Sequence, residues 1–238
     1  MNIRHACAVL LPTLLLATTA SAQDGTPLIS GELEHTGHTL RKGSSQMYLF
    51  TQYARGITED FQIGTSILGW IGGANVNAEY ATMQDDEKAF SLSTDLGYRW
   101  DGSTEVALVP TYTMGGQQTN RFNAGLGIGH TNTVIGSETY GAVSVPLRLS
   151  YDLVPNKQTT FRFHFNSDIM SAVGDDSSFV FTGGANWNRG WKKYRLALGL
   201  NVTNFGLGEL EEGLETVGIE PDLPAVYPLP YIRMWWRW

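Results

Sequence analysis

Most of this chain alternates apolar and polar residues in short runs, and this period of two constrains the fold more than any other feature. In the run 161–166 (FRFHFN), a phenylalanine occupies every second position. Leucines do the same in 196–200, followed by Val202. Because successive side chains of a β-strand point to opposite faces of the sheet, each run predicts a strand with one apolar face. The pattern predicts an all-β protein.

Turn-forming residues separate these runs and set the number of strands. Gly, Asn, Asp and Pro dominate the intervals, as expected for tight turns. We expect turns at 56–60, 72–75, 85–88, 101–102, 115–117, 131–137, 155–157, 174–177 and 189–190, and a long connection at 205–226. These limits give about eleven strands from Gln46 onward, and residues 28–40 are the candidate for a further, first strand. An even number is usual for single-chain bacterial barrels, so about twelve strands are expected, with ten as the alternative.

The two faces of the predicted strands distinguish a membrane barrel from a soluble sheet protein. A soluble sandwich or small ligand-binding barrel also has alternating strands. Here, however, the faces opposite the apolar ones carry glycines and charges instead of the residues of an apolar core. Aromatic residues gather near strand ends, at Tyr98 and Trp100, Trp187 and Trp191, and in the last strand. Lipid-facing apolar bands flanked by aromatic girdles are typical of membrane barrels, so we predict a transmembrane antiparallel up-and-down β-barrel.

The first residues have the order of a secretory signal peptide. Arg4 precedes the apolar run 7–17, and Ala20-Ser21-Ala22 forms a small-residue cleavage site. The apolar run is too short to span a bilayer as a helix. We therefore expect a signal peptide at 1–22 and a barrel at 23–238, the role of 28–40 being either a first strand or a periplasmic segment. The chain's only cysteine lies before residue 23, so no disulfide is expected.

The charge balance argues against a nucleic-acid partner. The chain has 16 basic and 23 acidic residues and a net charge of −7. Nucleic-acid binders present basic surfaces to the phosphate backbone. Beyond the first 22 residues there is no apolar run of the length that a transmembrane helix requires. We therefore expect this chain to cross a membrane with strands and not with helices.

The last residues form an apolar face that ends on the final side chain. Counting back by twos, Trp238, Trp236, Met234 and Ile232 share this face. This strand resembles the terminal strand of Gram-negative outer-membrane proteins, in which such a closing aromatic pattern is read by the barrel-insertion machinery. The resemblance implies location in the outer membrane, with membrane lipid and that machinery as partners.

A second resemblance concerns the hairpin at 53–64 (YARGITEDFQIG). It is similar to the "YGITDRLEIG" hairpins of poorly characterised outer-membrane barrels, whose tight turn is periplasmic. The resemblance implies that the turns near 85, 115, 155 and 189 are also periplasmic. The turns near 72, 101, 131 and 174 and the connection 205–226 would then face outward.

The predicted inner face is rich in charge, and arginines dominate its later strands. We expect these residues to line the lumen: Glu105, Arg121, Arg148, Arg162, His164, Asp168, Arg195, Arg233 and Arg237. A water-filled pore lined in this way would favour anionic solutes. The alternative is a structural network in which arginines pair with carboxylates and close the lumen. From this face we predict a narrow passive channel or transport protein for an unknown small solute.

Two other functions fit parts of the sequence. The acidic connection 205–226 would give a closed barrel a surface for a binding partner. Outer-membrane lipid hydrolases use a serine and a histidine oriented by a third polar group, and His164 with Asp168 shares one predicted face. No serine lies in a context similar to those enzymes. We therefore predict that the protein is not an enzyme and requires no cofactor or metal.

Overall fold

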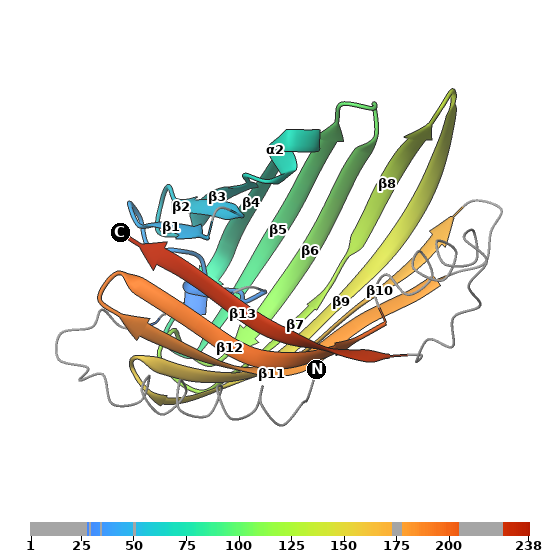
Figure 1. Cartoon of the computed structure of the whole chain (residues 1–238). Coiled ribbons are helices and arrows are strands. Elements are labelled where there is room, and N and C mark those ends of the chain that lie inside the picture. The colour runs from blue at the N-terminus through green and yellow to red at the C-terminus, as the bar shows by residue number, and fades with distance from the viewer. Residues whose placement is uncertain (1–27, 29, 34, 50, 173–177, 205–225) are drawn as a thin grey trace.

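The computed structural model describes residues 28, 30–33, 35–49, 51–172, 178–204 and 226–238, so the predicted signal peptide and most of the 205–226 connection lie outside the described residues. Thirteen strand segments form a single antiparallel sheet (Figure 1). Their bounds are β1 Ser45–Tyr48, β2 Gln52–Gly56, β3 Phe61–Ser66, β4 Gly73–Gln84, β5 Lys88–Arg99, β6 Thr104–Met114, β7 Arg121–Leu126, β8 Ile128–Ile135, β9 Glu138–Asn156, β10 Thr159–Ala172, β11 Ser178–Trp191, β12 Tyr194–Thr203 and β13 Tyr227–Arg237. Two short helices accompany them, the 3-10 helix η1 at Ser30–Glu32 and α2 at Gly69–Gly72.

The sheet closes on itself into a barrel. Each strand pairs with its neighbours in the chain, β1 pairs with β13, and β9 pairs with β10. The predicted all-β, up-and-down antiparallel barrel is confirmed, with twelve strands around the ring. The closing pair is short, because β1 pairs only with Trp235, Trp236 and Arg237 of β13. Closure joins the first and last strands, which would otherwise be the two edges of the sheet.

The segments β7 and β8 are one strand of the ring with a local interruption. Both pair with β6 on one side and with β9 on the other, in the same register before and after Gly127. The neighbouring strands carry Pro110 and Pro146 at this level, and proline has no N–H to donate to a ladder. The Gly127 N–H still donates to the Pro146 carbonyl oxygen at 2.9 Å. The interruption therefore has a local cause and does not change the topology.

Of the two alternatives expected for residues 28–40, a first strand or a periplasmic segment, the structure does not form the first. The described residues of 28–40 contain only the η1 turn, and the ring begins with two short strands, β1 and β2, in the region expected to hold one. All described residues of 28–40 except His35 are buried, at odd and even positions alike. A segment covered on all sides has no solvent-facing or lipid-facing side, so it lies inside the barrel and is not part of its wall.

The connections fall into two sets at opposite ends of the barrel. One end, called here the turn end, holds the connections 57–60, 85–87, 115–120, 157–158 and 192–193. The other, the mouth end, holds 49–51, 67–72, 100–103 and 136–137. This division matches the expected alternation. Two turns are displaced, because β8 continues to Ile135 and β11 continues to Trp191 through positions expected to turn.

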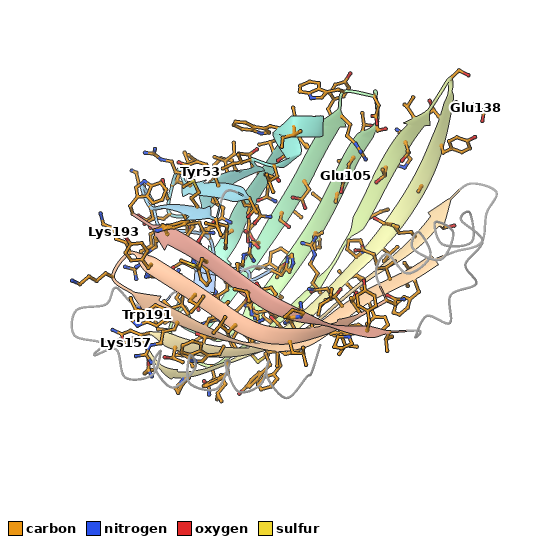
Figure 2. All side chains as sticks on the ribbon, in the orientation of Figure 1. Tyr53, Glu105, Glu138, Lys157, Trp191 and Lys193 are labelled. Atoms are coloured by element: carbon orange, nitrogen blue, oxygen red, sulfur yellow. The ribbon has the colours of Figure 1, made fainter. Side chains whose placement is uncertain are left out.

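The barrel is apolar outside and polar inside (Figure 2). Phe163 and Ile232 are 52% and 70% exposed on the outer face, whereas Arg162 and Arg195 are buried. The wall thus reverses the pattern of a soluble protein, which places its apolar side chains inside. Among the described residues, no helix is long and apolar enough to cross a bilayer.

One compact apolar cluster lies inside the barrel near the turn end. Leu28 and Leu33 pack there against Tyr48, Ala197 and Trp235. The rings of Tyr48 and Trp235 lie 5.6 Å apart. This cluster anchors residues 28–40 to the strands that close the ring, β1, β12 and β13.

We predict that Trp235→Ala destabilises the barrel much more than Trp236→Ala. Trp235 is 2% exposed in the inner cluster, and removing such a side chain from a packed site costs about 3–5 kcal/mol. Trp236 is on the outer face of the same strand, where it contacts Tyr194 edge to face. Urea unfolding of detergent-refolded protein, followed by far-UV circular dichroism, measures both. Equal losses would contradict the assignment of the anchor to Trp235.

Candidate functional site

Residues 28–40, as far as they are described, form an inner segment that crosses the lumen near the turn end (Figure 1). On one side, the Gly37 N–H donates to Thr113 Oγ1 on β6 at 2.7 Å. On the other, Tyr48 on β1 donates its hydroxyl to the Glu32 carbonyl oxygen at 3.0 Å. Because these contacts reach strands on different sides of the ring, the segment spans the lumen.

Two backbone contacts fix the inner segment to the turns below it. The Leu28 N–H donates to the Lys157 carbonyl at 2.7 Å, and the Ser30 N–H donates to the Gln117 carbonyl at 3.1 Å. At the other end of the segment, the Leu40 N–H donates to Gln62 Oε1 at 2.8 Å. The backbone N–H groups of the segment are thus satisfied by turns and side chains, without pairing to any strand edge.

The carboxylate of Glu32 is the strongest electrostatic contact between the inner segment and the wall. Its Oε2 accepts from Arg195 Nε at 2.7 Å, and its Oε1 accepts from Arg237. Glu32 and Arg195 have fully buried side chains. A buried charge is tolerated only when paired and hydrogen-bonded, and here one carboxylate is the shared partner of two guanidinium groups.

A second buried cluster has the same composition and lies within the wall. Asp152 on β9 accepts from Arg121 Nε at 2.8 Å and from Arg162 Nε at 2.6 Å, and Arg162 adds a second bond at 2.8 Å. Their side chains are at most 8% exposed. This cluster joins β7, β9 and β10 next to the turn end.

Above the inner segment the lumen contains two cavities, of about 410 Å³ and about 270 Å³. They share Leu33, His35 and Tyr48 as lining residues, so they adjoin over the inner segment. The charged residues that line the larger cavity are Glu79, Asp95, Glu105 and Arg148. The smaller cavity is lined by Arg162, His164, Arg233 and Glu32, together with four asparagines. Charged and amide side chains thus contribute to the lining of both cavities.

The structure distributes the residues expected in the lumen among three places. Glu105 and Arg148 line the larger cavity, while Arg162, His164 and Arg233 line the smaller one. Arg121, Arg195 and Arg237 belong to the ion-pair clusters near the turn end. Asp168 is half-buried on β10 and lines neither cavity.

Four of the six predicted arginines, Arg121, Arg162, Arg195 and Arg237, pair with carboxylates, as in the alternative expected from the sequence. Their counter-ions were not among the predicted site residues. Asp152 lies on a predicted inner face, and alternation gives a signal for it. No sequence pattern predicts this role for Glu32, because residues 28–40 are expected to be either a first strand or a periplasmic segment and not a segment inside the barrel.

The structure also places His164 and the predicted insertion signal of the last strand. His164 Nδ1 lies 3.4 Å from Asn186 Nδ2, and its ring lies 6.5 Å from that of Tyr231. Ile232, Met234 and Trp238 are exposed on the outer face of the last residues. Within the described part of the chain, no group of three His, Cys, Asp or Glu residues is arranged to hold a metal ion.

No family model, curated protein or solved structure matches this chain.

His38 is a titratable group of the inner segment and is held neutral. It is 1% exposed, and its Nδ1 lies 3.0 Å from Ser30 Oγ. Burial, and next the charge of Arg121, lower the pKa of His38 from 6.5 to about 4. The smaller influence of Asp85 acts in the opposite direction. Because the unfolded state binds this proton more readily, His38 contributes stability above pH 6.5 that is lost as the pH falls towards 4.

We predict that His38→Gln flattens the pH dependence of stability between pH 7.5 and 4.5. In the unmodified protein this histidine accounts for a loss of up to about 3 kcal/mol across the interval between its two pKa values. Urea midpoints measured at intervals over this range test the prediction, with His164→Gln on the lumen wall as the matched control. An unchanged slope in His38→Gln would contradict it.

We predict that Asp152→Asn is severely destabilising, whereas Asp168→Asn is not. The first change leaves two buried guanidinium groups without their carboxylate, at a cost of about 3–5 kcal/mol. Asp168 is half-buried and outside the cluster, so its loss should cost less than about 1 kcal/mol. Urea unfolding at pH 7.5 distinguishes the two. Similar losses would show that the Asp152 cluster contributes little.

Proposed function

We propose that this protein is an outer-membrane β-barrel that passes a small polar solute through a lumen gated by its own inner segment. The observation that carries the proposal is the position of that segment, which spans the lumen and lines both cavities. A polar lumen in a barrel of this width suits a small hydrated solute.

The outer surface supports the membrane location. Large apolar side chains are exposed on most strands, for example Leu96, Phe122, Phe163 and Ile232. Soluble monomers rarely expose contiguous apolar surface on this scale. The signal peptide, the terminal insertion pattern and the periplasmic turns expected from the sequence agree with this location and belong to the proposal.

The bonding of the inner segment supports its role as a gate. The strands of the wall pair with one another in a closed ring, and the inner segment takes no part in that pairing. It can leave the lumen without breaking a strand pair. Its departure exposes Arg195 and Arg237 to lumen water, which solvates the charges that Glu32 balances in the closed state. Displacement therefore breaks the ion pairs and the apolar contacts of the segment with Trp235, but no strand pair.

A second candidate is a barrel that stays closed and acts through its outward connections. The observation that favours it is the burial of the Glu32 carboxylate between two arginines, because breaking one side of a buried pair is costly. Single-channel recording separates the two candidates.

We predict that Glu32→Gln opens the barrel more often than the unmodified chain opens. The variant removes the charge that holds the inner segment to Arg195 and Arg237. Residues 23–238, refolded in detergent and inserted into planar bilayers, should show a several-fold higher open probability. Glu138→Gln, the same change at the first residue of β9 and outside both cavities, serves as the control.

A reversible lock makes the test sharper. Ser30→Cys combined with Gln117→Cys joins two positions whose backbones are 3.1 Å apart between N and O, in a mature chain with no other cysteine. The oxidised lock should abolish conductance, and a reductant should restore it. Silence in the unmodified chain, in Glu32→Gln and in the reduced lock, with folding shown by heat-modifiable gel mobility, would favour the closed barrel.

A further inference from the structure

The larger cavity contains three carboxylates on three consecutive strands, Glu79 on β4, Asp95 on β5 and Glu105 on β6. Glu79 is directly opposite Ser93, and Glu105 is directly opposite Gly97. These partners lie two residues to either side of Asp95 on β5, so each carboxylate is the diagonal neighbour of the next. Diagonal neighbours on one face of a sheet are about 7–8 Å apart. The three residues form an acidic ladder across the wall.

The acidic ladder runs from the mouth end towards the inner segment. Glu105 is the second residue of β6, next to a mouth-end connection (Figure 2). Glu79 Oε2 accepts from Gln62 Nε2 at 2.7 Å, and Gln62 Oε1 accepts from the Leu40 N–H at 2.8 Å. The ladder therefore ends one side chain away from the inner segment.

The hydrogen bonds of the ladder come from neutral donors. Ser91 donates to Glu79 at 2.7 Å, and Asn77 donates to Asp95 at 2.6 Å, which orient these carboxylates without neutralising them. Arg148 is the one basic side chain among the charged groups that line this cavity. Within the described residues, no ion pair joins Arg148 or another cation to the three carboxylates.

A buried amide in the same cavity gives an independent indication of a ligand. Gln46 on β1 is 5% exposed and lines the larger cavity. Its Nε2 donates to the Tyr48 hydroxyl at 3.2 Å, but its Oε1 has no hydrogen-bond partner among the described residues. A buried acceptor without a donor is costly, and a donor-bearing ligand would satisfy it.

We propose that the larger cavity is a binding site for a small organic cation that carries ammonium or guanidinium groups. Its volume of about 410 Å³ lies in the range of small-ligand sites. The carboxylates of the ladder and Gln46 Oε1 are acceptors, and the cation supplies the donors. This inference names the class of solute that the proposed channel would pass. It rests on the proposed function only for the passage of that solute through the lumen.

The smaller cavity gives less support for an anionic ligand. Its Arg162 is already bonded to Asp152 through two nitrogen atoms. Its Arg233 lies over the ring of Tyr48 at 3.6 Å and donates to Gln52 Oε1 at 2.8 Å. These guanidinium groups have protein partners, whereas the ladder carboxylates have only neutral hydrogen-bond donors.

Calorimetric titration with 1,4-diaminobutane tests the inference directly. The protein is residues 23–238 refolded in detergent, at low ionic strength and pH 7.5. We expect saturable binding, weakened about ten- to 100-fold in the double variant Asp95→Asn, Glu105→Gln, because charged hydrogen bonds are lost. Glu138→Gln, at the distant tip of the β8–β9 hairpin, is the matched control and should bind as the unmodified chain does (Figure 2).

Two outcomes would overturn the inference. One is equal binding of 1,4-diaminobutane by the double variant and the control, and the other is binding of succinate in place of the diamine. Because titration requires no conduction, it is independent of the proposed function. If the barrel binds the diamine but never conducts, the channel is refuted and the cation site is supported. If the barrel conducts but does not bind the diamine, the cation site is refuted and the channel is supported.

Discussion

The paired contact of Glu32 with Arg195 and Arg237 is the interaction on which the interior of this barrel depends. It brings a segment from the start of the described chain into contact with the last two strands of the ring. Without it, those strands would present two guanidinium groups to the lumen. With it, the inner segment closes the barrel at the turn end, and the lumen becomes two cavities with a common floor.

The closed ring supplies the frame for this arrangement. Every strand pairs on both sides over at least part of its length, so the ring is held together by the wall's own strands. The interior can therefore be polar, and a short apolar cluster around Trp235 is enough to seat the inner segment. The Asp152 cluster ties three adjacent strands together independently of that segment. Stability and closure thus rest on different groups of residues.

The same division determines the electrostatics of the lumen. Four of the arginines that suggest an anion pore from the sequence are paired with Asp152 or Glu32 near the turn end. Three of the four charged residues that line the larger cavity are carboxylates. Counting charges along an inner face therefore overstates the positive charge of this lumen, because several of its arginines are buried in ion pairs.

The sequence by itself determined the class of fold, the antiparallel order and the face on which most side chains lie. These follow from the period of two and from turn chemistry, which are local properties. Local patterns also placed Arg162, Arg195 and Trp235 on the inner face. They failed at the turns near 131 and 189, where pairing with β9 and β12 carries the strands further than the local residues indicate. Tertiary structure alone decided that residues 28–40 enter the lumen and that Glu32 meets Arg195, because that contact joins positions 163 residues apart and depends on the closure of the ring.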